Sequence, residues 1–476
     1  MAKPKILLIV PPVEDKYTNL VTNSNLLTSI RKYPALGLGY IAAVLEHNNY
    51  PVEFIDMFAL EMSYDELKMI LEKSSPHYVG ITTDIATIIP AKKITGMIHD
   101  LNPKCVVIGG GVNNSFYPNE IIAGGCFDIG IIGEGEETIV ELIDAIENGE
   151  DMGKIKGIAF RKGDEVIITD KRPVIKDLDS LPFPARHLMP NERYISNVGK
   201  RNTITTMLTS RGCPFNCLFC TKETSYRRRS MESVVAEIEH IKKDLGIDEI
   251  MFADSVFSVD IDHSIEICKE ICHRKINIIW SASTRVDCIS QELLYWMKKA
   301  GCVRIQYGVE SGESHVLKTL RKGITLNQVR DAVKWTKDAK LELMLHYMIG
   351  CPGDTIESIK KTIDLAVELD SDFATFTITT AMPNTDMMKL VIEMGIVDSD
   401  PFISFVKGEI NEIPKIVCIT EEYDREKLAK LLKEAYRRFY FRPRYIVKRL
   451  RKIHSFSELM NHITGFKNVL IEVTSR

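Results

Sequence analysis

The stretch RGCPFNCLFC, residues 211–220, decides how the rest of the chain is read. It places Cys213, Cys217 and Cys220 in a CxxxCxxC spacing directly after a predicted strand, 203–209. Three thiols on one loop can hold one metal centre, but tetrahedral zinc usually takes four ligands and an ordinary 4Fe–4S cluster takes four cysteines. No fourth cysteine lies close in the sequence. The spacing therefore predicts a metal centre with one open position, where a substrate or cofactor can bind.

Outward from this loop, strand-like and helix-like segments alternate over residues 199–400. Strands are expected at 203–209, 249–253, 277–281, 303–309, 341–348 and 373–379. Helical patterns separate them, at 231–245, 261–273, 291–300, 327–339 and 355–369. Successive βα units predict a partial (β/α)6 TIM barrel, with its chemistry at the C-terminal ends of the strands. Polar candidates follow those ends: Asp254, Arg285, Glu310 and Ser311.

Residues 1–150 show a second α/β pattern. Apolar strands are expected at 6–10, 52–55, 78–82, 105–108 and 129–132, with helical stretches between them. This order predicts a parallel, doubly wound, Rossmann-like sheet. Gly110, Gly111, Gly133 and Gly135 lie at strand ends, where bare backbone can approach a ligand or simply make a tight turn. Neither glycine run matches GxGxxG with a following acidic residue, which argues against a nicotinamide site.

The connection between the two α/β regions differs in composition. Residues 154–170 alternate apolar and polar side chains around a Lys-Gly-Asp turn, which predicts a β-hairpin. Prolines then concentrate in 177–190, as is typical of an extended linker. We therefore expect a first domain over 1–150, a hairpin and linker over 151–198, the barrel over 199–400 and a small, mainly helical extension over 401–476.

Composition sets limits on the class of protein. The chain has 476 residues, 45% of them hydrophobic and 26% charged, and a net charge of −4, which is typical of a globular protein and argues against nucleic acid as a partner. Its 11 cysteines are odd in number and no secretory leader precedes them, so we expect reduced thiols and a cytoplasmic location. A further CxxxC, Cys268 and Cys272, falls in a helical pattern and is interpreted as core.

The segment 436–452 is strongly basic. It contains eight Lys or Arg residues and no acidic residue, and five aromatic residues are interleaved with them. Such a segment can contact an anionic membrane surface or an acidic substrate. The alternative is a helical cap over the barrel.

The cysteine loop, with the aromatic Phe219 before its last cysteine, resembles the cluster loop of the radical SAM superfamily. This resemblance implies a 4Fe–4S cluster on Cys213, Cys217 and Cys220, with S-adenosylmethionine (SAM) at the open iron. Cleavage of SAM would yield a 5′-deoxyadenosyl radical, with Phe219 beside the adenine. The resemblance also implies SAM contacts: Asp254 at the methionine amino group, Arg285 at the carboxylate, and Glu310 and Ser311 near the ribose and carboxylate. The segment 252–255 departs from the Gly-Gly-Glu form of that superfamily.

The order of domains resembles the cobalamin-binding radical SAM enzymes, a group of methyltransferases and anaerobic magnesium-protoporphyrin ester cyclases. The stretches that carry this resemblance are 34–40, 109–111, 133–137 and 308–312. It implies that cobalamin is held at Gly110, Gly111, Gly133 and Gly135. The Asp-x-His-x-x-Gly pattern that supplies a lower histidine ligand in cobalamin-dependent mutases is absent from the sequence. Either the cobalt has no histidine ligand from this domain, or the domain has lost cobalamin; the resemblance favours binding.

The resemblance implies methylation of an unactivated carbon, with methylcobalamin as the methyl donor. One alternative is radical cyclisation or rearrangement without methyl transfer. Another, of a different class, is a non-catalytic iron–sulfur or cobalamin-binding module. A flavodoxin- or ferredoxin-type electron donor and a small-molecule, lipid or tetrapyrrole substrate are the expected partners, and peripheral membrane contact would run through 436–452.

Overall fold

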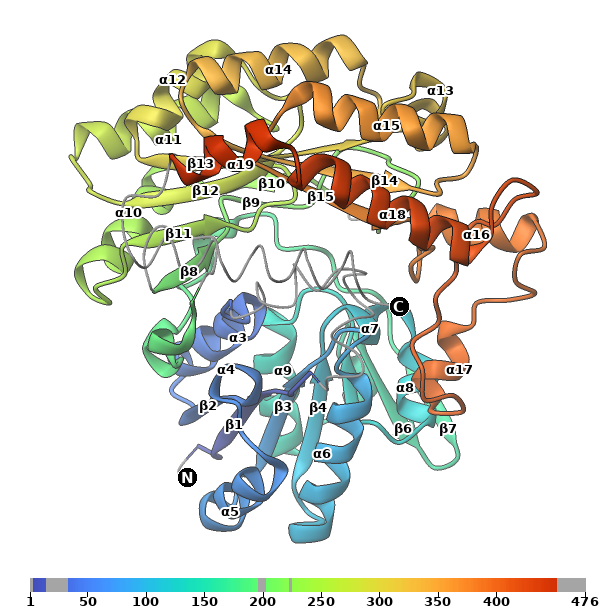
Figure 1. The fold of residues 1–476 in the computed structure, drawn as a ribbon. Coiled ribbons are helices and arrows are strands. Elements are labelled where there is room, and N and C mark those ends of the chain that lie inside the picture. The colour runs from blue at the N-terminus through green and yellow to red at the C-terminus, as the bar shows by residue number, and fades with distance from the viewer. Residues whose placement is uncertain (1–2, 14–32, 196–202, 222–224, 452–476) are drawn as a thin grey trace. The chain divides into compact units, whose positions relative to one another are not determined.

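The computed structural model describes residues 3–13, 33–195, 203–221 and 225–451. The chain divides into two compact units. Among the described residues, the first unit comprises those of Met1–Val21, Lys32–Tyr194 and Asp400–Pro414, and the second comprises those of Ile195–Ser399 and Lys415–Arg476. The expected α/β fold class is confirmed (Figure 1).

The first unit is built on a seven-stranded sheet with the order β2-β1-β3-β4-β5-β6-β7. Its first five strands are parallel: β1 (Ile6–Val10), β2 (Val52–Asp56), β3 (Tyr78–Thr82), β4 (Val106–Gly110) and β5 (Ile129–Ile131). Strand β1 is buried along almost its whole length, which explains its uninterrupted apolar sequence. The sheet reverses direction of winding between β1 and β3, so the ligand edge expected for this fold lies at their carboxyl ends.

Helices connect these strands. They are α3 (Leu36–His47), α4 (Met57–Leu60), α5 (Tyr64–Ser74), α6 (Ile88–Leu101), α7 (Val112–Phe116), α8 (Pro118–Ala123) and α9 (Glu136–Asn148). The predicted hairpin is present as β6 (Ile158–Lys162) and β7 (Glu165–Ile168), and it extends the sheet in antiparallel pairing.

The segment Asp400–Pro414 belongs to this first unit, although we expected residue 400 in the barrel and the rest in the C-terminal extension. Its helix α17 (Phe402–Lys407) packs against α8, and Tyr117 Oη donates to Asp400 Oδ2 over 2.7 Å. The domain boundaries expected from the sequence stay a prediction.

The second unit is an all-parallel, six-stranded sheet with the order β15-β14-β13-β12-β11-β8. Its strands are β8 (Ile204–Met207), β11 (Glu249–Phe252), β12 (Ile279–Thr284), β13 (Cys302–Glu310), β14 (Glu342–Ile349) and β15 (Phe373–Ile378). Helices follow the strands: α10 (Met231–Lys243), α11 (Ile261–His273), α12 (Gln291–Lys299), α13 (Ser314–Thr319), α14 (Leu326–Asp338), α15 (Ile356–Leu369) and α16 (Asp386–Glu393). One face of each strand joins the large apolar core, so the alternate residues face the barrel interior.

The C-terminal helices α18 (Arg425–Tyr440) and α19 (Pro443–Leu450) lie against the last barrel strand. Tyr436 Oη donates to Phe376 O over 3.1 Å and accepts from Phe376 N over 3.2 Å, and Tyr440 Oη bonds both backbone groups of Ala374 in the same way. The two hydroxyls therefore satisfy edge groups of β15 that would otherwise be open to another chain.

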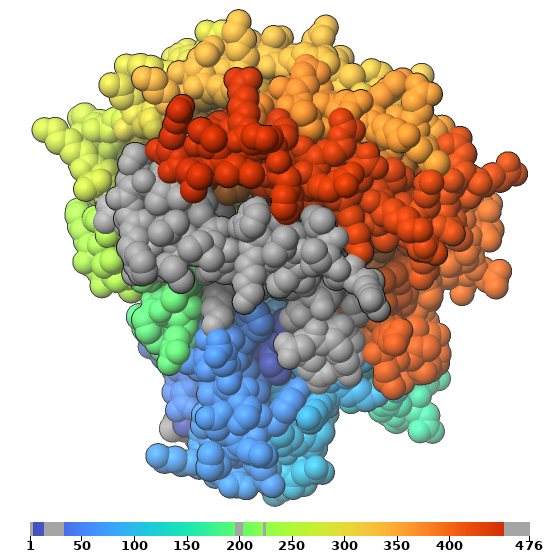
Figure 2. Space-filling model, viewed as in Figure 1, coloured from blue at the N-terminus to red at the C-terminus, as the bar shows by residue number. Residues whose placement is uncertain are grey.

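The basic segment is largely engaged by the barrel. Ion pairs join four of its cations to carboxylates in the second half of α15 and in the turn between α15 and β15: Arg438–Asp364, Arg442–Asp370, Lys448–Asp370 and Arg449–Asp372. Four of its aromatic residues are buried: Tyr436, Phe439, Tyr440 and Tyr445. In Figure 2 these red helices lie directly on the yellow and orange barrel segments. The structure therefore favours the cap over a membrane-binding surface; Lys452 lies outside the described residues. No described helix has the length and apolarity needed to cross a bilayer.

Candidate active site

The cysteine loop lies between two short paired strands, β9 (Ser210–Arg211) and β10 (Arg227–Arg228). Gly212 has φ +79°, and a Cβ there would collide with the backbone carbonyl of Ser225, so the turn into the loop requires glycine. Farther along, Leu218 N donates to Leu320 O and Leu218 O accepts from Met387 N, both over 2.9 Å. These bonds fix Cys217 and Phe219, the neighbours of Leu218, against the barrel.

The three cysteines differ in exposure: Cys213 is half-buried, Cys217 is buried and Cys220 is exposed. Burial raises the pKa of the Cys217 thiol, whereas the positive charges of Lys322 and Arg285 lower it. Within the described ranges, no three His, Cys, Asp or Glu side chains converge on a single metal-ion position. An iron–sulfur cluster makes a different demand, since its thiolates bind separate irons. Three thiols beside two cations fit an anionic, thiolate-bound cluster.

Arg285 follows the end of β12 and is one of these two cations. Its Nε and Nη2 donate to the two carboxylate oxygens of Asp287 over 2.9 and 2.8 Å, and Nη2 also donates to Lys322 O over 2.6 Å. The guanidinium carbon lies 3.8 Å from the ring centroid of Phe215, and Nη1 lies 3.8 Å from Cys217 Sγ. The fork that we expected to pair with the SAM carboxylate is therefore occupied by Asp287.

Lys322, the second cation, was missed in the sequence analysis. Its Nζ donates to Glu310 Oε1 over 2.7 Å, with both side chains nearly buried, and it lies 5.8 Å from the ring centroid of Phe219. Glu310 has φ +66°, an uncommon conformation for a residue other than glycine, at a break in register between β13 and β14. A Cβ at Gly308 would collide with Glu310 Oε1. The structure thus brings Glu310 and Phe219 together around Lys322.

Ser311 follows Glu310 and is fully buried. Its Oγ lies 3.3 Å from Thr362 Oγ1 on α15, and the same Thr362 hydroxyl accepts from Gly312 N over 2.9 Å. These contacts anchor the turn after β13 on α15.

Asp254 lies after β11 and braces the entry to the cysteine loop. Its Oδ1 accepts from Thr209 Oγ1 over 2.7 Å and from Ser210 Oγ over 2.6 Å, and both carboxylate oxygens accept from Thr209 N. Burial raises the pKa of Asp254, and these hydrogen bonds oppose that shift. The carboxylate is thus largely engaged within the protein.

A histidine on the barrel interior was also missed. His346 on β14 places Nδ1 2.6 Å from Thr375 Oγ1 and Nε2 3.1 Å from Gln306 Oε1. Burial lowers the pKa of His346, so its imidazole is favoured in the neutral form. The signal was available, because His346 alternates with the core residues Leu345 and Tyr347 along its strand.

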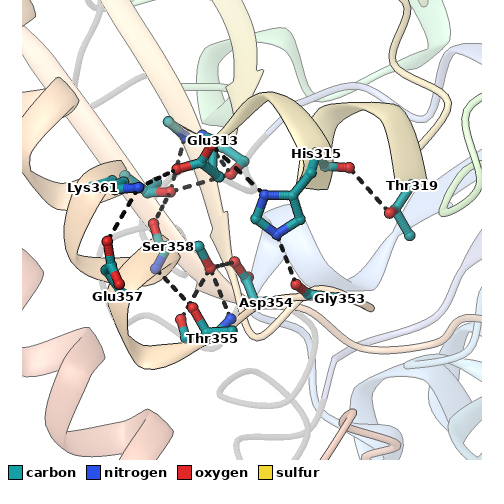
Figure 3. Close-up of polar contacts among 12 residues, drawn as sticks. Glu313, His315, Thr319, Gly353, Asp354, Thr355, Glu357, Ser358 and Lys361 are labelled. Carbon is teal, nitrogen blue, oxygen red and sulfur yellow. Dashed lines mark hydrogen bonds and ion pairs between the residues drawn. The ribbon is translucent and has the colours of Figure 1, made fainter.

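The loops that follow β13 and β14 are tied to each other and to α15 by polar contacts (Figure 3). Asp354 accepts from Cys351 N over 2.8 Å and from Ser358 Oγ. His315 Nε2 lies 3.0 Å from Gly353 O, and Lys361 pairs with Glu313 over 2.9 Å. This network gives the rim of the barrel a defined shape around the residues after its strands.

In the first unit, the four candidate glycines lie at or after the carboxyl ends of β4 and β5. Gly111 has φ +99° and a Cβ there would collide with Thr83 O, whereas a Cβ at Gly110 or Gly133 would meet nothing within 4 Å. A Cβ at Gly135 would lie 3.1 Å from Ile41 Cδ1. Gly111 and Gly135 therefore serve close packing, whereas the Cβ positions of Gly110 and Gly133 are open.

Comparison with known proteins identifies the class. Residues 207–366 match the radical SAM superfamily, and residues 25–143 match the B12 binding domain. An uncharacterized methyltransferase of Pyrococcus horikoshii is 31% identical over 457 residues, covering 95% of this chain and 96% of that protein. The anaerobic magnesium-protoporphyrin IX monomethyl ester cyclase of Rubrivivax gelatinosus is 28% identical over 431 residues, covering 87% of this chain and 75% of that protein.

Among solved structures, the fold is similar to the radical SAM methyltransferase TsrM of Kitasatospora setae, with a TM-score of 0.69 and 21% identity over 84% of this chain and 80% of that one. The cobalamin-dependent S-adenosylmethionine radical enzyme OxsB gives a TM-score of 0.74 with 19% identity, over 99% of this chain and 72% of that one. The chain belongs to the radical SAM superfamily and, within it, to the enzymes that carry a B12-binding domain. Its cofactors are a 4Fe–4S cluster, SAM and cobalamin.

Proposed function

We propose that this protein is a cobalamin-dependent radical SAM methyltransferase that acts on an unactivated carbon. The observation that carries the proposal is the cysteine loop after the first strand of an all-parallel, six-stranded partial barrel. Arg285 and Lys322 act on Cys217 of that loop, and the chain also has a B12-binding domain. The similarity to a protein named a methyltransferase extends over nearly the whole of both chains, which supports methyl transfer.

We assign the site residues as follows. Cys213, Cys217 and Cys220 hold the cluster, and Phe219 lies beside the adenine of SAM. When bound, the cluster and SAM supply a 5′-deoxyadenosyl radical that abstracts hydrogen from carbon, and cobalamin supplies the methyl group. Glu310 and Ser311 border the SAM site.

The cobalamin site is proposed at the carboxyl ends of β4 and β5. Gly110 and Gly133 leave open space there, while Gly111 and Gly135 hold the surrounding turns. These ends lie at the same carboxyl edge of the sheet as the β1–β3 switch point, and β4 is the neighbour of β3, which supports the assignment.

Two expected partners belong to the same proposal. Reductive cleavage of SAM needs one electron at a time, which a flavodoxin- or ferredoxin-type donor can deliver. Peripheral membrane contact through 436–452 has less support, because the aromatic residues of that segment are mostly buried.

Radical cyclisation without methyl transfer is the second candidate, favoured by similarity to the cyclase over 87% of this chain. The two can be separated with SAM that carries an isotopically labelled methyl group. Enzyme purified anaerobically with cobalamin is incubated with that SAM, a reductant, and the small-molecule and lipid fractions of a cell extract. Reductive cleavage leaves the labelled methyl group on methionine in either case, so methionine is separated first. Label in a product other than methionine, together with 5′-deoxyadenosine, supports the methyltransferase; 5′-deoxyadenosine with label only in methionine and unreacted SAM supports the cyclase. Absence of 5′-deoxyadenosine from a cluster-loaded enzyme would contradict both.

A further inference from the structure

Arg285 is a buried cation in contact with one of the proposed cluster ligands. We infer that Arg285 raises the reduction potential of the cluster through its contact with Cys217, and that it does not bind the SAM carboxylate. This inference rests on the proposed function, in which Cys217 is a cluster ligand. Arg285 would then act through Cys217, and the higher potential would make reduction of the cluster by the electron donor more favourable.

The contacts of Arg285 leave one group pointing at sulfur. A guanidinium has five N–H donors. Its Nε–Nη2 edge is occupied by Asp287, and Nη2 donates its second hydrogen to Lys322 O. Nη1 then lies 3.8 Å from Cys217 Sγ. Both edges that could bind a carboxylate through two N–H groups include Nη2, whose hydrogens are already taken, so the two N–H groups of Nη1 remain. Nη1 contacts Cys217 Sγ, and the guanidinium also interacts with the Cys288 thiol.

The guanidinium is also held rigidly. Its side chain is 5% exposed, and its carbon lies 3.8 Å from the ring centroid of Phe215 on the same loop as Cys217. Because Asp287 and Phe215 hold the guanidinium in place, it need not move when the charge on the cluster changes. The Arg285–Cys217 contact is therefore built to act on the cluster in both redox states.

The physical effect has a definite sign. Reduction adds negative charge to the cluster, and an N–H donor directed at a ligand sulfur stabilises the more negative state. Burial weakens solvent screening of that interaction. Asp287 offsets part of the positive charge but lies on the opposite edge of the guanidinium from Nη1. Loss of the contact should therefore move the midpoint potential to more negative values.

The barrel contains a matched control in Arg304. It is 8% exposed, pairs with Glu342 over 2.7 Å and lies 4.7 Å from the ring centroid of Phe373. Arg304 thus repeats the ion pair and the aromatic contact of Arg285. By strand register it lies about four residues nearer the N-terminal end of the barrel, roughly 13 Å away along the strand direction.

The test is an EPR-monitored redox titration of the full chain, purified anaerobically with its cluster, with iron and sulfide measured per chain. We expect Arg285→Met combined with Asp287→Asn to lower the midpoint potential, and Arg304→Met combined with Glu342→Gln to leave it unchanged. Arg285→Lys keeps the charge but loses the planar donor, so a smaller shift in the same direction is expected. If the Arg285→Met, Asp287→Asn variant does not accumulate as folded protein, the midpoint potential of Arg285→Lys is compared with that of the wild type instead.

An unchanged potential in the Arg285 variants, or an equal shift in the Arg304 pair, would overturn the inference. A loss of SAM affinity, measured by equilibrium binding, at an unchanged potential would also overturn it. That result would mean that Arg285 binds the SAM carboxylate. Failure of the proposed function looks different: the wild-type chain would hold no cluster, or would keep its iron after all three loop cysteines are replaced by alanine.

Discussion

The carboxylate of Asp254 bonds both the backbone N–H and the hydroxyl of Thr209, with Oδ1 at 3.1 and 2.7 Å. Thr209 and the neighbouring Ser210 stand immediately before the cysteine loop. A residue after the second barrel strand thereby fixes the point at which the chain leaves the first strand. The position of the cluster loop depends on this buried contact.

Replacing Asp254 should destabilise the protein and loosen the loop. Asp254→Ala leaves buried donors of Thr209 and Ser210 without an acceptor, at a cost of about 1–3 kcal/mol in the free energy of unfolding. Asp254→Asn keeps the acceptor Oδ1, so its free energy of unfolding should fall less. The exposed Asp244, paired with His240, is the control, because Asp244→Ala should cost no more than about 1 kcal/mol. Chemical denaturation gives the free energies, and equal losses at positions 254 and 244 would contradict the assignment.

Loss of any one loop cysteine should remove the cluster. Cys213→Ala, Cys217→Ala and Cys220→Ala each delete a thiolate that no neighbouring group replaces in the proposed ligand set. Cys272→Ala on α11 is the control, since this half-buried thiol belongs to the packing of that helix, and it should retain full iron. Iron, sulfide and visible absorption per chain measure the outcome. Full iron in the triple variant would remove the basis of the site.

Gly111→Ala should reduce cobalamin binding and leave the cluster in place. The substitution combines an unfavourable φ of +99° with a collision against Thr83 O, so the turn after β4 must move. Gly149→Ala is the control, because Gly149 has φ +69° but a Cβ there meets nothing within 4 Å. Cobalt and iron per chain are measured on protein purified with cobalamin. Equal cobalt in the two variants would argue against the proposed edge.

The stability of the barrel should fall as the pH drops below about 6.5. Burial lowers the pKa of His346 from the usual histidine value of about 6.5, with Glu310 opposing the shift and Lys322 acting in the same direction as burial. The unfolded chain therefore binds a proton that the native state does not, and stability falls between pH 6.5 and the lower native pKa. His346→Gln should flatten this dependence. Unfolding free energies measured across pH 5 to 8 (roughly the range in which histidine titrates) test it, and an unchanged slope would reject His346 as the source.

Two arginines of the C-terminal cap should differ in their effect on stability. Arg449 pairs with Asp372 where the side chains are 10% and 7% exposed, so Arg449→Ala leaves a buried carboxylate without its cation, at about 3–5 kcal/mol. Arg438 pairs with Asp364 at the surface, so Arg438→Ala should cost about 0–1 kcal/mol. Chemical denaturation compares them. A small effect at position 449 would mean that the cap does not depend on its buried ion pair.

Local patterns predicted much of the architecture. Short apolar runs, separated by helical patterns, located the barrel strands to within a few residues of their observed bounds. The segment expected at 303–309, for example, is β13 over Cys302–Glu310. The cysteine spacing and the order of domains were sufficient to predict the superfamily and its cofactors, which the comparisons confirm. These features depend on residues close in sequence, so they can be read without a structure.

The sequence by itself therefore determined the fold class and the chemistry of the loop. Only the tertiary structure decided which charges meet there: Arg285 faces Cys217, and Lys322, missed in the sequence, joins Glu310 to the site. It also placed the basic C-terminal residues on barrel carboxylates. The physical reason is that ion pairs and N–H···S contacts act over a few ångströms in space, and their partners here lie up to 78 residues apart in the chain. Packing of the strands and helices selects those partners, and no local pattern records them.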